Sequence, residues 1–254
     1  MTDYKSLSSD ELFRRVDAAG RTLPPELIRV LLARRIDLRE RILNNFAESL
    51  NDDWDDPDDP RWYRAVHYGL LLIAYRERKA LPIFAAIYMN TESYENLIEW
   101  FEEEPAHFGP AAIPVFQAVV DAAPGLEWDF GAAMSVSILS AIAMRFPQTR
   151  QEIVSFLRSH LPPLHMNGNL TPDNDDEIDE LWASIVDALA ELRDFDSKQQ
   201  VLAMFDADLI DPTEIDRESY LDALTEPPSS EKKPPFDIFA MYARVAKFNT
   251  PKDV

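Results

Sequence analysis

Cysteine is absent from the 254-residue chain. Its absence excludes disulfide bonds, thiolate nucleophiles, iron–sulfur clusters and zinc sites with cysteine ligands, and it fits a reducing compartment. Glycine is scarce, with 6 residues, whereas proline is abundant, with 19. Few residues can therefore supply the positive-φ turns of a hairpin-rich β protein, and most prolines stand where a helix would begin or end. These shortages favour an all-α fold.

Long apolar runs are missing as well. No stretch of 18 residues lacks both charge and proline, so we expect no membrane-spanning helix. The first residues show no basic-then-apolar pattern of a secretory signal. We therefore expect a cytoplasmic protein.

Basic residues are few and unevenly placed. Lys and Arg number 25 against 46 Asp and Glu, a net charge of −21, and none lies between Lys79 and Arg145. Residues 1–50 carry a net charge of +1, so the remaining residues carry −22. Nucleic acids and anionic lipid surfaces bind through Lys and Arg, so the chain is expected to bind neither.

Apolar residues recur at helical spacing along most of the chain, with Pro, Asp or Gly between the runs. We predict about 12–13 helices on this pattern. The expected helical ranges are 9–19, 26–35, 38–50, 62–75, 80–90, 92–101, 112–122, 129–144, one around 152–156, 175–192 and 197–205, followed by a final short helix. The stretch 51–60, with 6 aspartates and two prolines, is predicted to be a loop.

Similar helix openings recur along the chain. Ala80-Leu-Pro-Ile-Phe84 and Ala112-Ile-Pro-Val-Phe116 lie 32 residues apart, and Glu152-Ile-Val-Ser-Phe156 follows 40 residues later. Proline suits the first helical turn, where its missing N–H has no partner in the helix. Because a helix pair cannot bury its apolar stripe alone, such pairs must stack. The sequence thus predicts an α-solenoid of stacked antiparallel helix pairs.

The apolar helix, the Arg76-Glu-Arg-Lys79 turn and the Ala-Leu-Pro-Ile-Phe helix resemble a HEAT-like repeat. From Leu23-Pro-Pro-Glu-Leu27 to Phe205-Asp-Ala-Asp-Leu-Ile-Asp-Pro212, the chain is similar to a bacterial family of HEAT-like proteins with no assigned function. The resemblance implies a solenoid and no particular activity. Some members end in a small Cys/His zinc module, which a chain without cysteine cannot form.

Three segments are expected in the domain organisation: the solenoid over 1–225, a Pro/Ser/Lys linker over 226–235, and an amphipathic helix over 236–250. The apolar stripe of this last helix would expose too much surface if it stayed bare. It is expected to pack on the same molecule as a cap. The alternatives are a helix-swapped dimer and docking to another protein. The stripe comprises Ile238, Met241, Tyr242, Val245 and Phe248.

No motif in the sequence demands catalysis. There is no Gly-x-Ser-x-Gly stretch, no repeated His-Glu pair and no glycine-rich phosphate loop. His67, in an apolar run, is expected to be a hydrogen-bonded core histidine, and His160 and His165 straddle two prolines rather than sharing a helix face. The acidic loops lack the glycine of a calcium-binding EF-hand. We predict no catalytic residue, no metal site and no cofactor.

Partner binding is the expected function. An acidic helix face and the turn after it supply the candidate residues Glu92, Glu95, Glu99, Glu102, Glu103 and Glu104, joined by Trp54 of the acidic loop. The glutamates either keep the protein soluble or receive a basic partner, and Trp54 either packs back onto the helices or anchors that partner. We predict a scaffold or adaptor that binds a protein or peptide on its concave or acidic face. The alternative is an enzyme or a chromophore-handling, lyase-like protein with a site in the groove.

Overall fold

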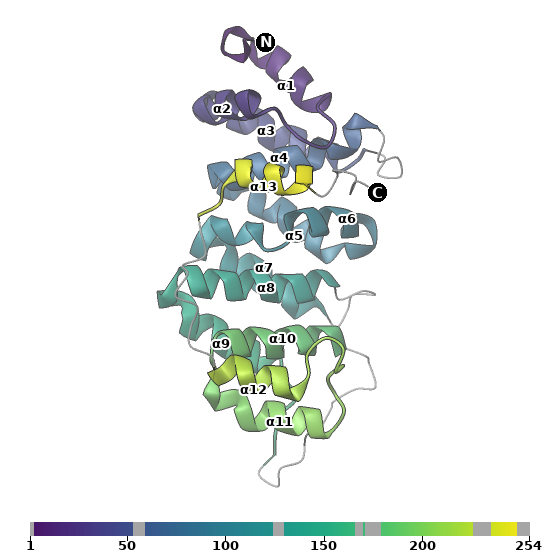
Figure 1. The fold of residues 1–254 in the computed structure, drawn as a ribbon, viewed down its shortest axis with the longest axis vertical. Coiled ribbons are helices and arrows are strands. Elements are labelled where there is room, and N and C mark those ends of the chain that lie inside the picture. Colours follow the sequence, from purple (N-terminus) through teal and green to yellow (C-terminus); the bar gives the residue numbers. More distant parts are fainter. Residues whose placement is uncertain are drawn as a thin grey trace. The chain divides into compact units, whose positions relative to one another are not determined.

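The computed structural model describes residues 3–52, 59–123, 130–165, 170, 179–225 and 235–247. Within these ranges it contains thirteen α-helices and no strand, with one isolated bridge between Leu164 and Leu170 (Figure 1). The predicted all-α class and helix number are thus confirmed. The helices are α1 (Ser9–Asp17), α2 (Pro25–Ala33), α3 (Arg35–Ser49), α4 (Arg64–Tyr75), α5 (Leu81–Met89), α6 (Thr91–Phe101), α7 (Ile113–Ala122), α8 (Phe130–Arg145), α9 (Arg150–Ser159), α10 (Asp179–Glu191), α11 (Lys198–Asp206), α12 (Arg217–Thr225) and α13 (Ile238–Lys247).

The chain divides into two compact units. The first unit comprises residues 1–83 and 234–254, and the second comprises residues 84–233, so the boundary falls inside α5. Each unit has its own buried apolar residues. A single solenoid over 1–225 would require a defined placement of one unit on the other, and it stays a prediction.

Helix α4 forms the centre of the first unit. It is apolar around almost its whole circumference, and 10 of its 12 residues are buried. A helix of this kind is stable only when other helices surround it. Helices α1, α2, α3 and α13 all pack against it, and Figure 1 shows α13 (yellow) lying beside α4 although the two are far apart in sequence.

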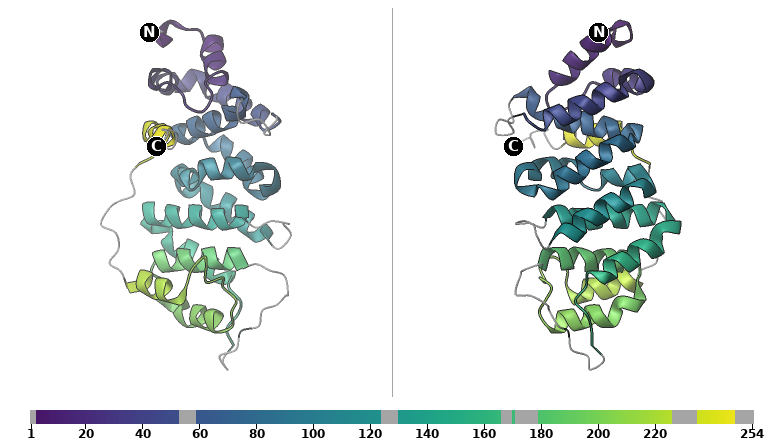
Figure 2. Two further views of the ribbon diagram at one scale, coloured as in Figure 1. Left: turned by 45° about the vertical axis from the view of Figure 1, so that its right-hand side comes forward. Right: turned by 180° about the vertical axis from the view of Figure 1, so that it is seen from behind.

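Helix α8 has the same role in the second unit. Of its 16 residues, 11 are buried, many of them Ala, Ser or Gly. Helices α6, α7, α9 and α10 pack on it, as does the 3₁₀ helix η4 (Glu104–Ala112). The rotated views in Figure 2 show α8 (teal) and α10 (green) as neighbouring layers. Small side chains on α8 let these helices approach closely.

One connection recurs in three helix pairs. A 3₁₀ turn joins α4 to α5, α8 to α9 and α10 to α11. At the ends of α4 and α10, a left-handed arginine stops the helix: Arg76 has φ 51° and Arg193 has φ 53°. The Arg76 N–H donates to the Ile73 carbonyl and the Glu77 N–H to the Leu72 carbonyl, which closes the helix end. The recurrence gives the chain a local repeat at the level of helix, turn and helix.

Most predicted helix bounds agree with the structure to within a few residues. The region after α6 differs, because the sequence predicted no helix between 101 and 112. The structure has the 3₁₀ helix η4 there, over Glu104–Ala112, with a kink at Gly109, whose φ is 72°. The predicted linker residues 226–234, and residues 53–58 of the predicted loop, lie outside the described residues.

Helix α8 comes closest to its neighbours at Gly131. A Cβ built there would lie 1.9 Å from the Tyr88 carbonyl oxygen and 2.7 Å from Thr91 Oγ1. The Gly131 N–H also donates to Thr91 Oγ1 across 3.2 Å. We expect Gly131→Ala to lower the free energy of unfolding by about 1–3 kcal/mol, because backbone must move to admit the methyl group. Urea denaturation measures the loss.

Ser137→Ala, at an exposed position of the same helix, is the matched control. It should leave stability unchanged or slightly higher, because alanine favours the helix. Equal stability of Gly131→Ala and the control would contradict the close approach.

Candidate functional site

The net charge of the chain belongs to one unit. The first unit contains 17 basic and 17 acidic residues, so its net charge is zero. The second contains 8 basic and 29 acidic residues, a net charge of −21. A partner attracted by charge would therefore be drawn to the second unit.

Helix α6 carries the predicted acidic face within this second unit. Glu92, Glu95 and Glu99 are all exposed. A kink at Tyr94, with φ −131° and ψ 17°, separates Glu92 from Glu95 and Glu99, and these last two, four residues apart, share one side of the helix. Glu102, directly after the helix, is also exposed. The structure therefore exposes four of the six predicted glutamates to solvent on and directly after α6, and we call these four residues the α6 acidic face.

The far end of the α6 acidic face has a constrained backbone. Glu102 has φ 43° and ψ −126°, a conformation that costs a non-glycine residue on the order of 1–3 kcal/mol. Its N–H donates to the Ile98 carbonyl, and its carbonyl accepts a hydrogen bond from the Tyr88 hydroxyl across 2.9 Å. Burial, followed by the nearby charges of Glu102 and Glu104, raises the pKa of Tyr88 well above its ordinary value. The hydroxyl therefore stays protonated and keeps donating.

The other predicted partner-binding residues differ in their surroundings. Glu103 and Glu104 are half-buried, and a carboxylate oxygen of Glu104 lies 3.3 Å from His107 Nε2. Glu104 thus contributes to packing around the buried His107 more than to the exposed face. Trp54 lies outside the described residues.

His67 is a fully buried titratable group of the first unit, with both ring nitrogens hydrogen-bonded. Its Nε2 lies 2.6 Å from the Gly20 carbonyl oxygen, which can only accept, so Nε2 carries the proton. Nδ1 then accepts a hydrogen bond from the Tyr242 hydroxyl across 2.6 Å. The structure confirms that His67 is a hydrogen-bonded core histidine.

The environment of His67 keeps the ring neutral. Burial lowers its pKa to about 4, although the bond to Gly20 offsets part of that effect. Tyr63 stacks on the ring, with centroids 6.3 Å apart. The pKa of Tyr242 is raised well above its ordinary value by burial, so its hydroxyl remains a donor. Through Tyr242, His67 ties α13 to α4 and to the turn after α1.

Helix α13 uses its predicted apolar stripe in this contact. Ile238, Met241 and Tyr242 are buried in the first unit, and the Arg29 guanidinium lies 5.5 Å above the Phe239 ring. The described residues include neither Phe248 nor the side chain of Val245. The helix thus lies on its own chain in this structure.

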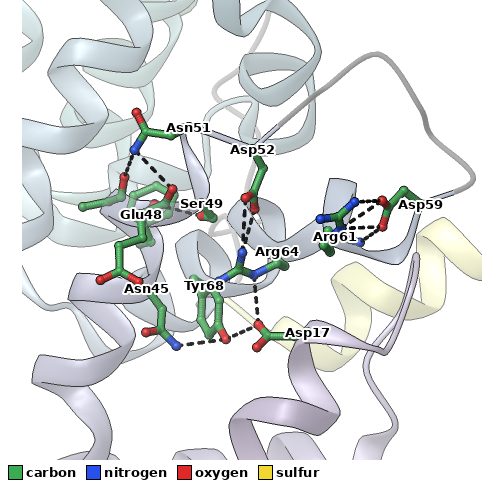
Figure 3. A network of polar contacts seen from close by, with 12 residues as sticks. Asp17, Asn45, Glu48, Ser49, Asn51, Asp52, Asp59, Arg61, Arg64 and Tyr68 are labelled. Atoms are coloured by element: carbon green, nitrogen blue, oxygen red, sulfur yellow. Dashed lines mark hydrogen bonds and ion pairs between the residues drawn. The ribbon is translucent and has the colours of Figure 1, made fainter.

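A second polar cluster of the first unit joins α1, α3 and α4 (Figure 3). Arg64 contacts Asp17 at 3.0 Å and Asp52 at 2.9 Å, and the Tyr68 hydroxyl donates to Asp17 across 2.6 Å. Asn45 donates to the same hydroxyl. Burial alone would lower the pKa of Arg64, but the charges of Asp17 and Asp52 raise it above its ordinary value. Each of these groups has a partner on another helix or on the residues after α3, so the cluster holds three helices together.

Three surface clefts accompany these clusters. One of about 670 Å³ lies between the N-terminal turn and α2, one of about 210 Å³ lies beside the start of α13, and one of about 610 Å³ runs along α11. None of the three is lined by His67. In the described residues, no group of three or more His, Asp or Glu side chains is arranged to hold a metal ion.

Sequence analysis missed the cleft along α11. Its signal was Phe195, a large apolar residue between Asp194 and Asp196 in a polar turn.

None of the helices within the described ranges has the length and hydropathy to cross a bilayer.

Comparison with family models, with curated proteins and with solved structures finds no match. The resemblance to HEAT-like proteins therefore rests on the residue pattern alone. Function has to be inferred from the surfaces of the chain itself.

The buried His67 makes stability depend on pH. The unfolded ring binds a proton near pH 6.5, whereas the folded ring does so only near pH 4. The unfolded state is therefore favoured progressively as pH falls from 6.5 to 4, and the effect is absent above pH 7. We expect His67 to contribute a loss of roughly 2–3 kcal/mol in unfolding free energy between pH 7 and pH 4.5. Chemical denaturation at a series of pH values measures it.

His67→Gln is the comparison variant, because an amide can donate and accept but does not titrate in this range. The variant should lose less stability on acidification than the unmodified protein. Parallel pH curves for the two proteins would contradict a neutral, buried His67.

The packing of α13 predicts the effect of its removal. Deleting residues 226–254 would expose the ring of His67 and leave its Nδ1 without the Tyr242 hydroxyl. We expect the truncated protein to have a clearly lower thermal midpoint than the full chain. If α13 packs on its own chain, the midpoint of the full chain does not depend on protein concentration. A midpoint of the full chain that rises with concentration indicates a swapped dimer, and an unchanged midpoint after deletion would contradict a cap.

Proposed function

We propose that this chain is a non-catalytic protein-binding module and that its α6 acidic face binds a basic protein or peptide. One observation carries the proposal: Glu92, Glu95, Glu99 and Glu102 are exposed on and directly after one helix of a unit with a net charge of −21. No Lys or Arg occurs between Lys79 and Arg145, so α5, α6 and α7 contain no basic residue. A Lys- or Arg-rich partner would bring the opposite charge to this surface.

The physics of such an interface favours fast and salt-sensitive association. Carboxylates of one sign on one face create a field that steers a cationic partner and raises its association rate. Exposed ion pairs each contribute only about 0.2–1 kcal/mol, so several must act together. The constrained backbone at Glu102 supports the proposal, since it fixes one end of the face before a partner arrives.

The predicted architecture is consistent with this function. Arrays of stacked helix pairs present extended surfaces that bind proteins and peptides. The resemblance to HEAT-like proteins would place such a surface on the concave side of a solenoid. The proposal itself needs only the α6 acidic face.

Neutralising this face tests the proposal. We expect the triple variant Glu92→Gln, Glu95→Gln and Glu99→Gln to bind a Lys/Arg-rich peptide about tenfold more weakly, because three modest charge interactions are lost. Fluorescence anisotropy with a labelled peptide gives the dissociation constant, and repeating it across salt concentrations gives the electrostatic share.

A matched control separates local from total charge. Asp121→Asn, Glu152→Gln and Glu191→Gln remove three exposed charges of the same unit on α7, α9 and α10. This control has the same net charge as the test variant and should retain most of the affinity. If both triple variants weaken binding equally, charge acts without a defined face and the proposal fails.

A further inference from the structure

Phe195 is exposed without being loosely held. Its side chain is 55% accessible, and within the described residues only Ile36 is a comparably exposed large hydrophobic residue. It belongs to the 3₁₀ helix η7 (Phe195–Ser197), whose start is fixed by the ion pair of Arg158 with the buried Asp194. The Ser197 hydroxyl donates to the Asp194 carbonyl across 3.1 Å. The aromatic ring is thus displayed on a rigid turn.

A cleft of about 610 Å³ begins at this ring and follows one face of α11. Its helix residues recur at i, i+4 and i+8, so they share a side of the helix. Leu164, from the segment after α9, forms the other wall. The lining residues are Leu164, Phe195, Asp196, Lys198, Gln199, Leu202, Ala203 and Asp206.

The lining of this cleft contains both apolar and charged side chains. Leu164, Phe195, Leu202 and Ala203 contribute apolar side chains to the lining, and the acidic Asp196 and Asp206 lie before the start and at the end of α11. Arg158 Nη2 lies 2.9 Å from Asp196 Oδ2, and the Arg217 guanidinium pairs with the Asp206 carboxylate. Both carboxylates are thus held in place. Lys198 is the single basic residue of the lining.

The surroundings of the cleft are strongly acidic. The chain from Asp206 to Asp222 holds seven acidic residues, and Arg217 is its only basic one. All seven are exposed. A ligand in the cleft would therefore contact its apolar side chains while the exposed acidic residues nearby surround it with negative charge.

We propose that the α11 cleft binds an amphipathic, basic helical segment of a partner protein. Apolar side chains of the segment would pack on Phe195, Leu202 and Leu164, and its Lys or Arg residues would face Asp196 and Asp206. The lined face of α11 is about 12 Å long at 1.5 Å per residue, which matches two turns of a docked helix. Helix-in-groove recognition uses this combination of apolar anchors and charged flanks.

Charge complementarity selects this occupant. The exposed acidic residues from Asp208 to Asp222, with Arg217 as the only basic residue among them, favour a cationic segment over a neutral one, and an anionic membrane surface would be repelled. The inference rests on the proposed function for the basic character of the partner, and it adds a second surface and a required apolar stripe.

The probe is a synthetic helical peptide with leucines at i, i+3, i+4 and i+7 and lysines elsewhere. Two control peptides have the same composition with the leucines scattered around the helix, or glutamates in place of the lysines. Anisotropy titrations should give tighter binding of the amphipathic basic peptide than of either control, by tenfold or more. Equal binding of the scattered peptide would overturn the apolar part of the inference.

Phe195→Ser is the decisive variant, because its exposed side chain can be removed without disturbing the core. Binding of the amphipathic peptide should weaken at least tenfold. Ile36→Ser, which removes the other exposed large hydrophobic residue, should leave the affinity unchanged. Unchanged binding by Phe195→Ser overturns the proposal, as does a dimer of the unmodified chain that Phe195→Ser dissociates, since the occupant would then be a second copy.

The α6 triple variant separates this inference from the proposed function. If Phe195→Ser weakens binding of the amphipathic peptide and the α6 variant does not, the α11 cleft is its site. If only the α6 variant weakens binding, the inference fails while the proposed function stands. If neither variant changes the affinity, both fail.

Discussion

Every helix in this protein depends on burying an apolar side that it cannot bury alone. The demand is greatest for α4 and α8, because each is apolar around most of its circumference and must be enclosed by other helices. Full burial of one large aliphatic side chain contributes about 1.5–3 kcal/mol, so a few lost neighbours would outweigh the whole stability of a domain. Helices α1, α2, α3 and the distant α13 cover α4, while α6, α7, α9 and α10 cover α8.

The sequence predicted a structural feature correctly where a local pattern, such as helical spacing or a first-turn proline, was enough to determine it. Helical spacing and first-turn prolines predicted α7 as 112–122, and the structure has it at Ile113–Ala122. The apolar surroundings of His67 predicted a hydrogen-bonded core histidine, but its partner Tyr242 lies 175 residues away, and no local pattern identifies such a pair. The α11 cleft was missed because its walls come from separate segments and meet only in the folded chain.

Charge is arranged by unit rather than by helix. The first unit balances its acidic and basic residues in internal pairs such as Arg64 with Asp17, whereas the second leaves most carboxylates in solvent. Mutual repulsion in the second unit costs stability, and its exposed acids are the group that a cationic partner would neutralise. The candidate glutamates of α6 are therefore some of the many exposed acidic residues of the second unit. The constrained backbone of Glu102 and the exposed ring of Phe195 are two further features of this unit.

In this glycine-poor chain, Arg193 occupies a left-handed backbone position that glycine would usually fill. A glycine there would adopt the left-handed turn without the roughly 1–2 kcal/mol of steric cost that arginine bears. Glycine has no side chain, however, and the Arg193 guanidinium donates to the carbonyls of Leu224 and Thr225 at the end of α12, across 3.4 and 3.5 Å. One residue thus terminates α10 and caps α12, so two helix ends that are about thirty positions apart share a single stop signal.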